Sequence, residues 1–478
     1  MELGGRSPGA AIGLGQTLRA RSSPRSVTKV WLDVGDLLSW QHGNVTGIQR
    51  VMACVATEFL KLHARGGPIG FCRHAEETGF IEVSADKLHP VIKRLNSDEL
   101  SVPSHGGASF LRTAYGILSR ALEPNPREPY TSFKARLKRP LRAIELWLVR
   151  KWLRANAIFR DNDVLLNIGS SWERPHYRVA LAELRRHTDL QYVVLIHDLI
   201  PWRRPQFFLP DLVERFAAWA CDTVVSADRL LVTSMWSRED LLAFTRQLQI
   251  DERPIAVVRL GGQEISRPNT PPPTEFQQDP AGFVLCVGTV EPRKNHQLLL
   301  RTWSRLLQRH DHSLVPTLIW AGREGWMCEA LLAEAEALDF LDGKLVWLGR
   351  AGGLPDDILH GLYRTCLFTM FPSIYEGWGL PVAEALAHGK FCIASNASSI
   401  PEIGGNLIDY HAPEDLEGCL TLVERAIFDP AYRSARQGRI EREYRMPSWA
   451  ECSENILKVC LGMRSMSQPA ASDRAPGA

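Results

Sequence analysis

The sequence predicts an α/β protein made of two Rossmann-like, doubly wound domains, and two observations lead to this prediction. The chain has 478 residues, more than a single hydrophobic core comfortably accommodates. Short apolar runs alternate with stretches of helical periodicity along most of it, which is typical of parallel sheets covered by helices. The predicted strands cover residues 30–34, 164–168, 192–196, 229–233, 283–288, 317–321, 345–349, 367–371 and 391–395.

A proline-rich stretch separates the two predicted domains. Residues 263–280 contain five prolines, which continue neither a helix nor a strand and suit a linker. The strand pattern restarts at Phe283, although a long surface loop within one domain is the alternative. The expected organisation is a disordered segment 1–28, an N-terminal Rossmann-like domain 29–262 with a basic insertion at about 105–157, the linker 263–280, a C-terminal Rossmann-like domain 281–446, a final helix 447–464 and a disordered tail 465–478.

Composition narrows the class of protein. A net charge of +2 argues against nucleic-acid binding by the whole chain. The ten cysteines are scattered without a CxxC pair, so we expect no zinc site and a reducing compartment. No window has the apolar length of a signal peptide or a membrane span. We therefore expect a cytoplasmic protein, with peripheral attachment to the inner face of the plasma membrane as an open alternative.

The segment 112–154 raises the question of membrane contact. It carries eleven basic residues against three acidic ones, interleaved with tryptophan and leucine. Apolar burial and attraction to anionic lipid act together in such a segment, which favours binding to a membrane surface. The alternative is a solvated face whose apolar side packs on the domain, and Pro140 interrupts the helical period.

The most informative stretch for chemistry runs from Phe371 to Gly389. It reads as a strand, a glycine turn and a helix that has Pro381 at its start. The free N–H groups and the dipole of such a helix terminus can bind a diphosphate. Glu376 on the turn and Glu384 on the helix can face the same crevice and accept hydrogen bonds from sugar or ribose hydroxyls. Taken alone, the same features also fit a tight connection and a carboxylate that is favourable on dipole grounds.

A second constellation follows the first predicted strand of the C-terminal domain. Arg293 and Lys294 come shortly after residues 283–288, at the carboxyl end of that strand, where ligands bind in doubly wound sheets. Cations there can neutralise a leaving diphosphate. This pairing favours a functional interpretation of both constellations.

These residues also carry a resemblance. The segments Gly-Thr-Val-Glu-Pro-Arg-Lys-Asn (288–295), Ala-Gly-Arg-Glu-Gly-Trp (321–326), Leu-Gly (348–349), Pro-Ser-Ile-Tyr-Glu-Gly-Trp-Gly-Leu-Pro-Val-Ala-Glu-Ala-Leu-Ala (372–387) and Ser-Ser-Ile-Pro-Glu (398–402) occur in this order. Together they resemble the family 4 retaining glycosyltransferases, which have the GT-B fold of two Rossmann-like domains facing across a cleft. The N-terminal half is similar more loosely, through Asp33-Val, 46–51 and 196–201, which are typical of bacterial mannosyl- and rhamnosyltransferases of polysaccharide biosynthesis.

The resemblance implies that the N-terminal domain 29–262 binds the acceptor and the C-terminal domain 281–446 binds the nucleotide sugar, and it implies roles for individual residues. Glu384 would bind the ribose, and Lys294 and Arg293 would bind the diphosphate. Glu376 and the glycine turn would bind the transferred sugar, which His197 would approach. The expected catalytic set is therefore Glu376, Lys294, Arg293 and His197. The other expected donor contacts are Gly377, Trp378, Gly379, Leu380, Thr289, Leu348, Gly349, Gly47 and Ile48, of which Leu348 and Gly349 would offer backbone to the base. The expected acceptor contacts are His42 and Arg50. The final helix would cross back onto the N-terminal domain.

Three details of the sequence qualify this picture. Many relatives have a phosphate-binding arginine where this chain has Thr289, so Arg293 or Arg350 is expected to replace it. The segment 399–402 fits a helix capping box, which gives Glu402 a structural role. The segment 161–163 matches the Asp-x-Asp of metal-dependent glycosyltransferases, but it precedes a strand and is interpreted as a turn.

The resulting hypothesis is a metal-independent, cofactor-free retaining glycosyltransferase that moves a hexose, mannose before others, from a nucleotide sugar to a saccharide or lipid-linked saccharide. GDP-mannose ranks first as donor on resemblance, ahead of dTDP-rhamnose and a UDP-sugar. Acceptor hydroxyl deprotonation by the leaving diphosphate is the expected mechanism. A sugar-nucleotide epimerase or hydrolase on the same fold, and a non-catalytic nucleotide-sugar-binding protein, are the alternatives.

Overall fold

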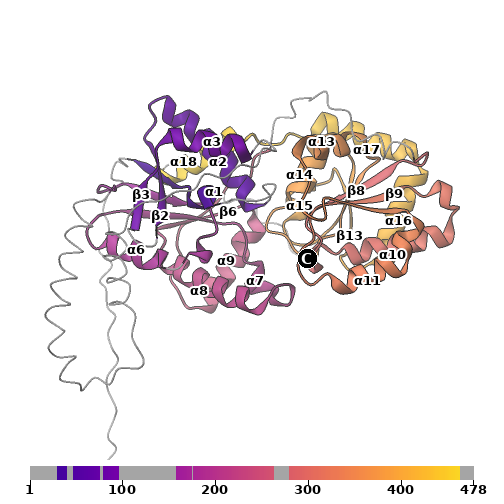
Figure 1. The fold of residues 1–478 in the computed structure, drawn as a ribbon, viewed down its shortest axis with the longest axis horizontal. Coiled ribbons are helices and arrows are strands. Elements are labelled where there is room, and N and C mark those ends of the chain that lie inside the picture. Colours follow the sequence, from indigo (N-terminus) through magenta and orange to yellow (C-terminus); the bar gives the residue numbers. More distant parts are fainter. Residues whose placement is uncertain are drawn as a thin grey trace, which may run out of the picture.

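The computed structural model of the protein describes residues 29–39, 47–75, 79–95, 158–174, 176–262 and 279–462. Figure 1 shows two lobes side by side, the N-terminal one in indigo to magenta and the C-terminal one in orange to yellow. Each lobe is built on its own parallel sheet. The chain passes from one sheet to the other between Val257 and Phe283, and most of the expected linker, residues 263–278, lies outside the described part.

The N-terminal sheet has the strand order β3-β2-β1-β4-β5-β6-β7 and is parallel except for the β2–β3 pair. Alternate residues of β4 face opposite sides: Val164 and Leu166 join the core under one layer of helices, and Leu165 joins the core under the other. Its strands are β1 (Val30–Asp33), β2 (Ile69–Ala75), β3 (Gly79–Glu82), β4 (Val164–Asn167), β5 (Gln191–Ile196), β6 (Arg229–Val232) and β7 (Ile255–Val257).

Helices cover both faces of this sheet, because each face is apolar. They are α1 (Gly35–Ser39), α2 (Ile48–Ala64), α3 (Ala85–Leu95), η1 (Ser171–Glu173), α6 (Tyr177–Arg185), α7 (Ile200–Arg203), η2 (Pro205–Phe207), α8 (Pro210–Ser226) and α9 (Met235–Gln247).

The C-terminal sheet has the order β10-β9-β8-β11-β12-β13, and all its strand pairs are parallel. Its strands are β8 (Phe283–Val287), β9 (Thr317–Ala321), β10 (Leu345–Leu348), β11 (Thr369–Phe371), β12 (Cys392–Ser395) and β13 (Asp409–His411). Its helices are η4 (Pro292–Lys294), α10 (His296–Arg309), η5 (His312–Leu314), α11 (Glu329–Ala337), α12 (Asp339–Asp342), α13 (Asp356–Thr365), α14 (Leu380–Ala387), α15 (Ile400–Gly404), α16 (Leu416–Phe428) and α17 (Pro430–Glu443).

The last helix, α18 (Trp449–Cys460), belongs to the core of the N-terminal lobe. Trp449 and Ile456 are buried together with α2, and Figure 1 shows α18 in yellow among the indigo helices α2 and α3. A capping box of Ser448 and Glu451 starts this helix. The chain therefore crosses back to the first lobe after α17.

All nine predicted strands are present, within one or two residues of the expected bounds. The sequence interpretation missed β2, β3, β7 and β13, which are short or lie toward the sheet edges. Within the described residues, no helix has the length and apolar character needed to cross a membrane. The basic segment 112–154 lies outside the described part of the chain.

Candidate active site

A cavity of about 470 Å³ lies between the two lobes, where the carboxyl ends of both sheets meet. Its walls come from both halves of the chain, which is where ligands bind in doubly wound folds. It brings together most of the predicted site residues: Gly47, Ile48, Arg50, His197, Thr289, Arg293, Lys294, Glu376, Gly377, Trp378, Gly379, Leu380 and Glu384. His42 lies outside the described residues.

Glu376 is the anion at the centre of a buried ion cluster. Its Oε1 lies 2.6 Å from Lys294 Nζ and its Oε2 lies 2.9 Å from an Arg293 guanidinium nitrogen. Burial raises the pKa of this carboxyl, but Arg293 and Lys294 outweigh burial and lower the pKa to about 2. Arg293 also pairs with Glu291 at 2.6 Å. Glu376 is therefore ionised, and it holds both cations near the carboxyl end of β8.

The glycine turn after Glu376 is hydrogen-bonded to the N-terminal lobe. The carbonyl of Gly377 accepts hydrogen bonds from the hydroxyls of Thr233, Ser234 and Ser237, at 3.0, 2.7 and 3.1 Å. A Cβ on Gly377 would lie 2.6 Å from Asp198 Cβ, so only glycine permits this approach. Three hydroxyls from one lobe thus fix the backbone that carries the predicted sugar contacts of the other.

Glu384 lies on α14 and is held from two sides. Tyr363 donates its hydroxyl hydrogen to Oε2 at 2.9 Å, and Arg50 of α2 lies 3.3 Å from Oε1. Arg50 also pairs closely with Asp356. The expected acceptor contact Arg50 is therefore bound to the predicted ribose carboxylate, on the donor side of the cavity.

His197 follows β5 and faces the cavity in its neutral form. Burial lowers its pKa, and its Nε2 lies 2.9 Å from the carbonyl oxygen of Ile168, to which a neutral ring can donate. Burial raises the pKa of the adjacent Asp198. The pair therefore places a neutral imidazole and a carboxyl group beside Gly377.

Two expected contacts lie away from the cavity. Leu348 and Gly349 do not line it; the Leu348 carbonyl accepts the Gly322 N–H at 2.9 Å, and the following residues 352–354 form the wall instead. Of the two candidates to replace the missing phosphate-binding arginine, Arg293 lines the cavity, whereas Arg350 pairs with Glu324 at 2.7 Å on the surface.

The predicted capping box at 399–402 is wrong. Ser399 makes no side-chain cap to its own helix, and the Glu402 carboxylate accepts the backbone N–H groups of Met235 and Trp236 at 2.8 and 2.7 Å. Glu402 thus caps α9 of the other lobe, where the helix dipole favours an anion. Its role is structural, as expected, but it acts across the interface.

The segment 161–163 forms a turn, as predicted. Asp163 accepts hydrogen bonds from Trp31 Nε1 and Arg160 N at 2.9 Å each, and Asp161 accepts one from Asp189 N at 2.8 Å. These carboxylates lie at the amino end of β4, opposite to the cavity. The described residues contain no group of three or more side chains arranged to hold a metal ion.

Several cavity residues were not predicted from the sequence. They are Ser170, Trp172, Glu173, Asp198, Thr233, Arg323 and Trp326. Asp198, Arg323 and Trp326 lie within segments that carried the resemblance, and position after a strand could have pointed to Ser170 and Thr233. Trp172 and Glu173 carry no such signal, so only the fold brings them to the cavity.

Comparison with known proteins identifies the C-terminal domain. Residues 281–424 match the family model described as glycosyl transferases group 1. The chain is similar to O-antigen chain mannosyltransferase B of Escherichia coli, at 27% identity over 272 residues, which cover 56% of this chain and 69% of the relative. It is 26% identical over 288 residues to the serotype-specific mannosyltransferase WbdA of E. coli, covering 58% of this chain but only 34% of that longer protein.

Solved structures with the same architecture have little sequence in common with this chain. Sucrose-phosphate synthase of Thermosynechococcus elongatus superposes with a TM-score of 0.55 at 15% identity, covering 90% of this chain and 98% of that structure. The Anabaena protein HepE, solved in complex with UDP and glucose, gives a TM-score of 0.55 at 14% identity, covering 91% and 99%. Family model, relatives and two-lobed architecture together make this protein a glycosyltransferase of the GT-B fold, with a C-terminal domain of the glycosyl transferases group 1.

Proposed function

We propose that the protein is a retaining mannosyltransferase that transfers mannose from GDP-mannose to a saccharide or lipid-linked saccharide in polysaccharide biosynthesis. The carrying observation is that Glu376, Glu384 and the cations Lys294 and Arg293 share one cavity between the lobes. Mannose is favoured because the E. coli relatives are named as mannosyltransferases.

In this proposal, charged groups of the cavity bind the diphosphate and the ribose of the donor. Lys294, Arg293 and the amino end of α14 supply positive potential for the diphosphate, and Glu384 accepts hydrogen bonds from the ribose hydroxyls. Arg50 already forms an ion pair with Glu384, so the ribose hydroxyls must either replace Arg50 at this carboxylate or bind beside it. Arg50 comes from the N-terminal lobe, and donor binding is therefore coupled to the fit of the two lobes.

The proposal of retention comes from the resemblance to the family 4 enzymes, and the state of Glu376 bears on the route by which it would occur. A carboxylate bound by two cations is a poor nucleophile, which favours an electrostatic and positioning role over a covalent intermediate. The leaving diphosphate would take the proton of the acceptor hydroxyl on the same face of the sugar. The cations that stabilise its growing charge act without a divalent metal, so the proposed reaction is metal-independent and needs no cofactor.

The test is transfer from a panel of donors, GDP-mannose, dTDP-rhamnose and UDP-glucose, to α-linked mannose oligosaccharides. We expect GDP-mannose to give the longer oligosaccharide, with the α configuration of the donor retained in the product as read by NMR. A β-linked product would refute retention, and preference for another donor would refute the mannose assignment. Nucleotide release at the same rate without acceptor would favour a hydrolase, and an altered free nucleotide sugar would favour an epimerase.

Membrane contact through residues 112–154 stays a prediction from the sequence, because that segment lies outside the described residues. Neutralising its Lys and Arg side chains should reduce co-sedimentation with anionic lipid vesicles, by roughly 1 kcal/mol per charge that reaches the surface. Unchanged sedimentation would favour the solvated-face alternative.

A further inference from the structure

A second cavity, of about 420 Å³, opens in the N-terminal lobe between η1, α6 and α8. Its walls include Trp172, Tyr177, Trp219 and Asp222. None of its lining residues belongs to the donor machinery described above. Its size is in the range of small-molecule sites, and its lining combines aromatic rings with a few polar groups.

One short segment forms the partition between this second cavity and the active-site cavity. Ser170 and Glu173 line the active site, Ser171 and Arg174 line the second cavity, and Trp172 lines both. The two cavities are therefore adjacent, with a single tryptophan side chain as their common wall. A chain-like ligand in the active-site cavity would have only Trp172 between it and the second cavity.

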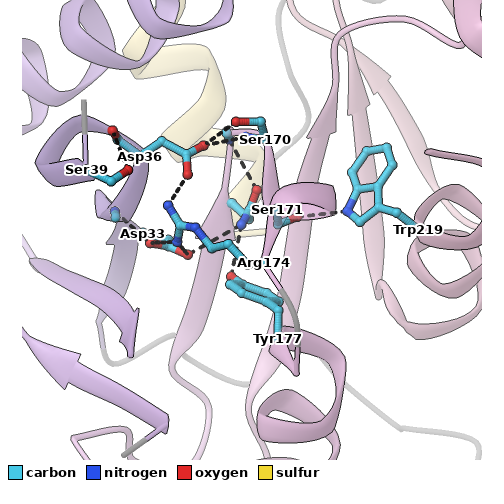
Figure 2. A network of polar contacts seen from close by, with 11 residues as sticks. Asp33, Asp36, Ser39, Ser170, Ser171, Arg174, Tyr177 and Trp219 are labelled. Atoms are coloured by element: carbon cyan, nitrogen blue, oxygen red, sulfur yellow. Dashed lines mark hydrogen bonds and ion pairs between the residues drawn. The ribbon is translucent and has the colours of Figure 1, made fainter. Parts of the chain in front are cut away.

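A polar network holds this partition in place, as Figure 2 shows. Asp36 accepts hydrogen bonds from Ser170 N and Ser170 Oγ at 2.5 and 2.9 Å and pairs with Arg174. Arg174 also pairs with the buried carboxylate of Asp33 at 3.2 Å. The loop that separates the cavities is thus anchored at both of its ends to the carboxyl end of β1, and its geometry is preorganised.

The wall on the α8 side is aromatic. The Trp172 ring packs edge-on against Phe216 and Trp219, with centroids 5.6 and 5.1 Å apart. Trp219 is oriented by its Nε1–H, which donates to Ser171 Oγ at 2.8 Å. Rigid indole rings give contact area to the apolar C–H face of a sugar at little cost in conformational entropy.

The charges around the second cavity are already compensated. Each of its three arginines has a carboxylate partner: Arg174 has Asp33 and Asp36, Arg178 has Asp222 at 2.8 Å, and Arg215 has Asp211 at 3.0 Å. An anion such as phosphate would compete with these carboxylates, whereas a neutral ligand rich in hydroxyls can hydrogen-bond to both partners of a pair. The cavity therefore suits a neutral sugar.

We propose that the second cavity binds a sugar unit of the acceptor chain, next to the unit that receives the transferred sugar. This inference rests on the proposed function, because it assumes a saccharide acceptor. It makes the enzyme sensitive to acceptor length: chains long enough to pass Trp172 gain a second point of attachment. Short acceptors gain none.

The test compares Ala218→Trp with Ala330→Trp. Ala218 is exposed on α8 and lines the second cavity, so an indole there should fill part of it; Ala330 is also exposed, on α11 of the other lobe, and serves as the control. Calorimetric binding of α-linked mannose mono-, di-, tri- and tetrasaccharides is measured on each protein, together with GDP-mannose turnover. Asp222→Ala, which removes a polar group from the same wall, is the second variant.

We expect the wild type and Ala330→Trp to bind the tetrasaccharide about tenfold more tightly than the monosaccharide, and Ala218→Trp and Asp222→Ala to lose most of this difference. Donor KM should be equal in all four proteins. Affinity that does not depend on length in the wild type, or length dependence that survives Ala218→Trp, would overturn the proposal. Length-dependent binding without GDP-mannose turnover in the wild type would refute the proposed donor and leave the second cavity intact.

Discussion

The buried carboxylate of Glu376 should make the stability of the C-terminal lobe depend on pH. Its pKa is about 2 in the folded protein, where an ordinary glutamate has 4.5. At 1.36 kcal/mol per pKa unit this difference corresponds to about 3 kcal/mol. Because the folded pKa is the lower one, the contribution is complete above pH 4.5 and is lost as the pH falls from 4.5 toward 2.

Glu376→Gln isolates this contribution, since glutamine has the same shape and does not titrate. The free energy of unfolding in urea should be lower in the variant than in the wild type, and the difference should be constant from pH 7 to about 5.5. Between pH 5.5 and 3.5 the difference should shrink by about 1.4 kcal/mol, because the unfolded wild-type carboxyl takes up its proton while the folded one stays ionised.

Glu443→Gln is the matched control, because Glu443 is an exposed carboxylate of the same lobe, paired with Arg439 at 2.9 Å. Solvent screens that pair, so the control should behave like the wild type at each pH. A Glu376→Gln difference that stays constant down to pH 3.5 would refute the reasoning. It would mean that Lys294 and Arg293 do not hold the carboxylate in the ionised form.

Three further predictions concern the donor site, the interface between the lobes and metal dependence. Glu384→Ala should mainly raise the donor KM. Lys294→Ala should lower kcat by about 10²- to 10³-fold, because negative charge on the phosphate grows as the bond to the sugar breaks. Steady-state kinetics with GDP-mannose would separate the two effects, and full activity in both variants would exclude this site. Glu402→Ala should lower the free energy of unfolding by about 1 kcal/mol in urea, because the N–H groups of Met235 and Trp236 lose their acceptor, although Ser234 still caps the next N–H of α9; an unchanged value would show that these two hydrogen bonds are not needed. Transfer should survive excess EDTA and the Asp163→Ala substitution; loss with EDTA and recovery with Mn²⁺ would contradict metal independence.

The sequence by itself located nine of the thirteen strands of the described residues and the two C-terminal segments, 288–295 and 372–387, that contribute to the wall of the active-site cavity. Parallel strands that are buried on both faces consist of short apolar runs, and the nine predicted strands could be located from these runs. The turn at Glu376 and the start of α14 were visible because glycine and proline have local conformational preferences. These features depend on residues close in the chain.

Only the tertiary structure decided how the lobes meet. Arg50 pairs with Glu384, Glu402 accepts hydrogen bonds from the first N–H groups of α9, and the Gly377 carbonyl accepts hydrogen bonds from three hydroxyls of the other lobe. Each contact joins residues more than 100 positions apart, and a contact of that kind leaves no period or motif in the local sequence. The active site lies between the two lobes, and its geometry therefore follows from packing that no single stretch of the chain encodes.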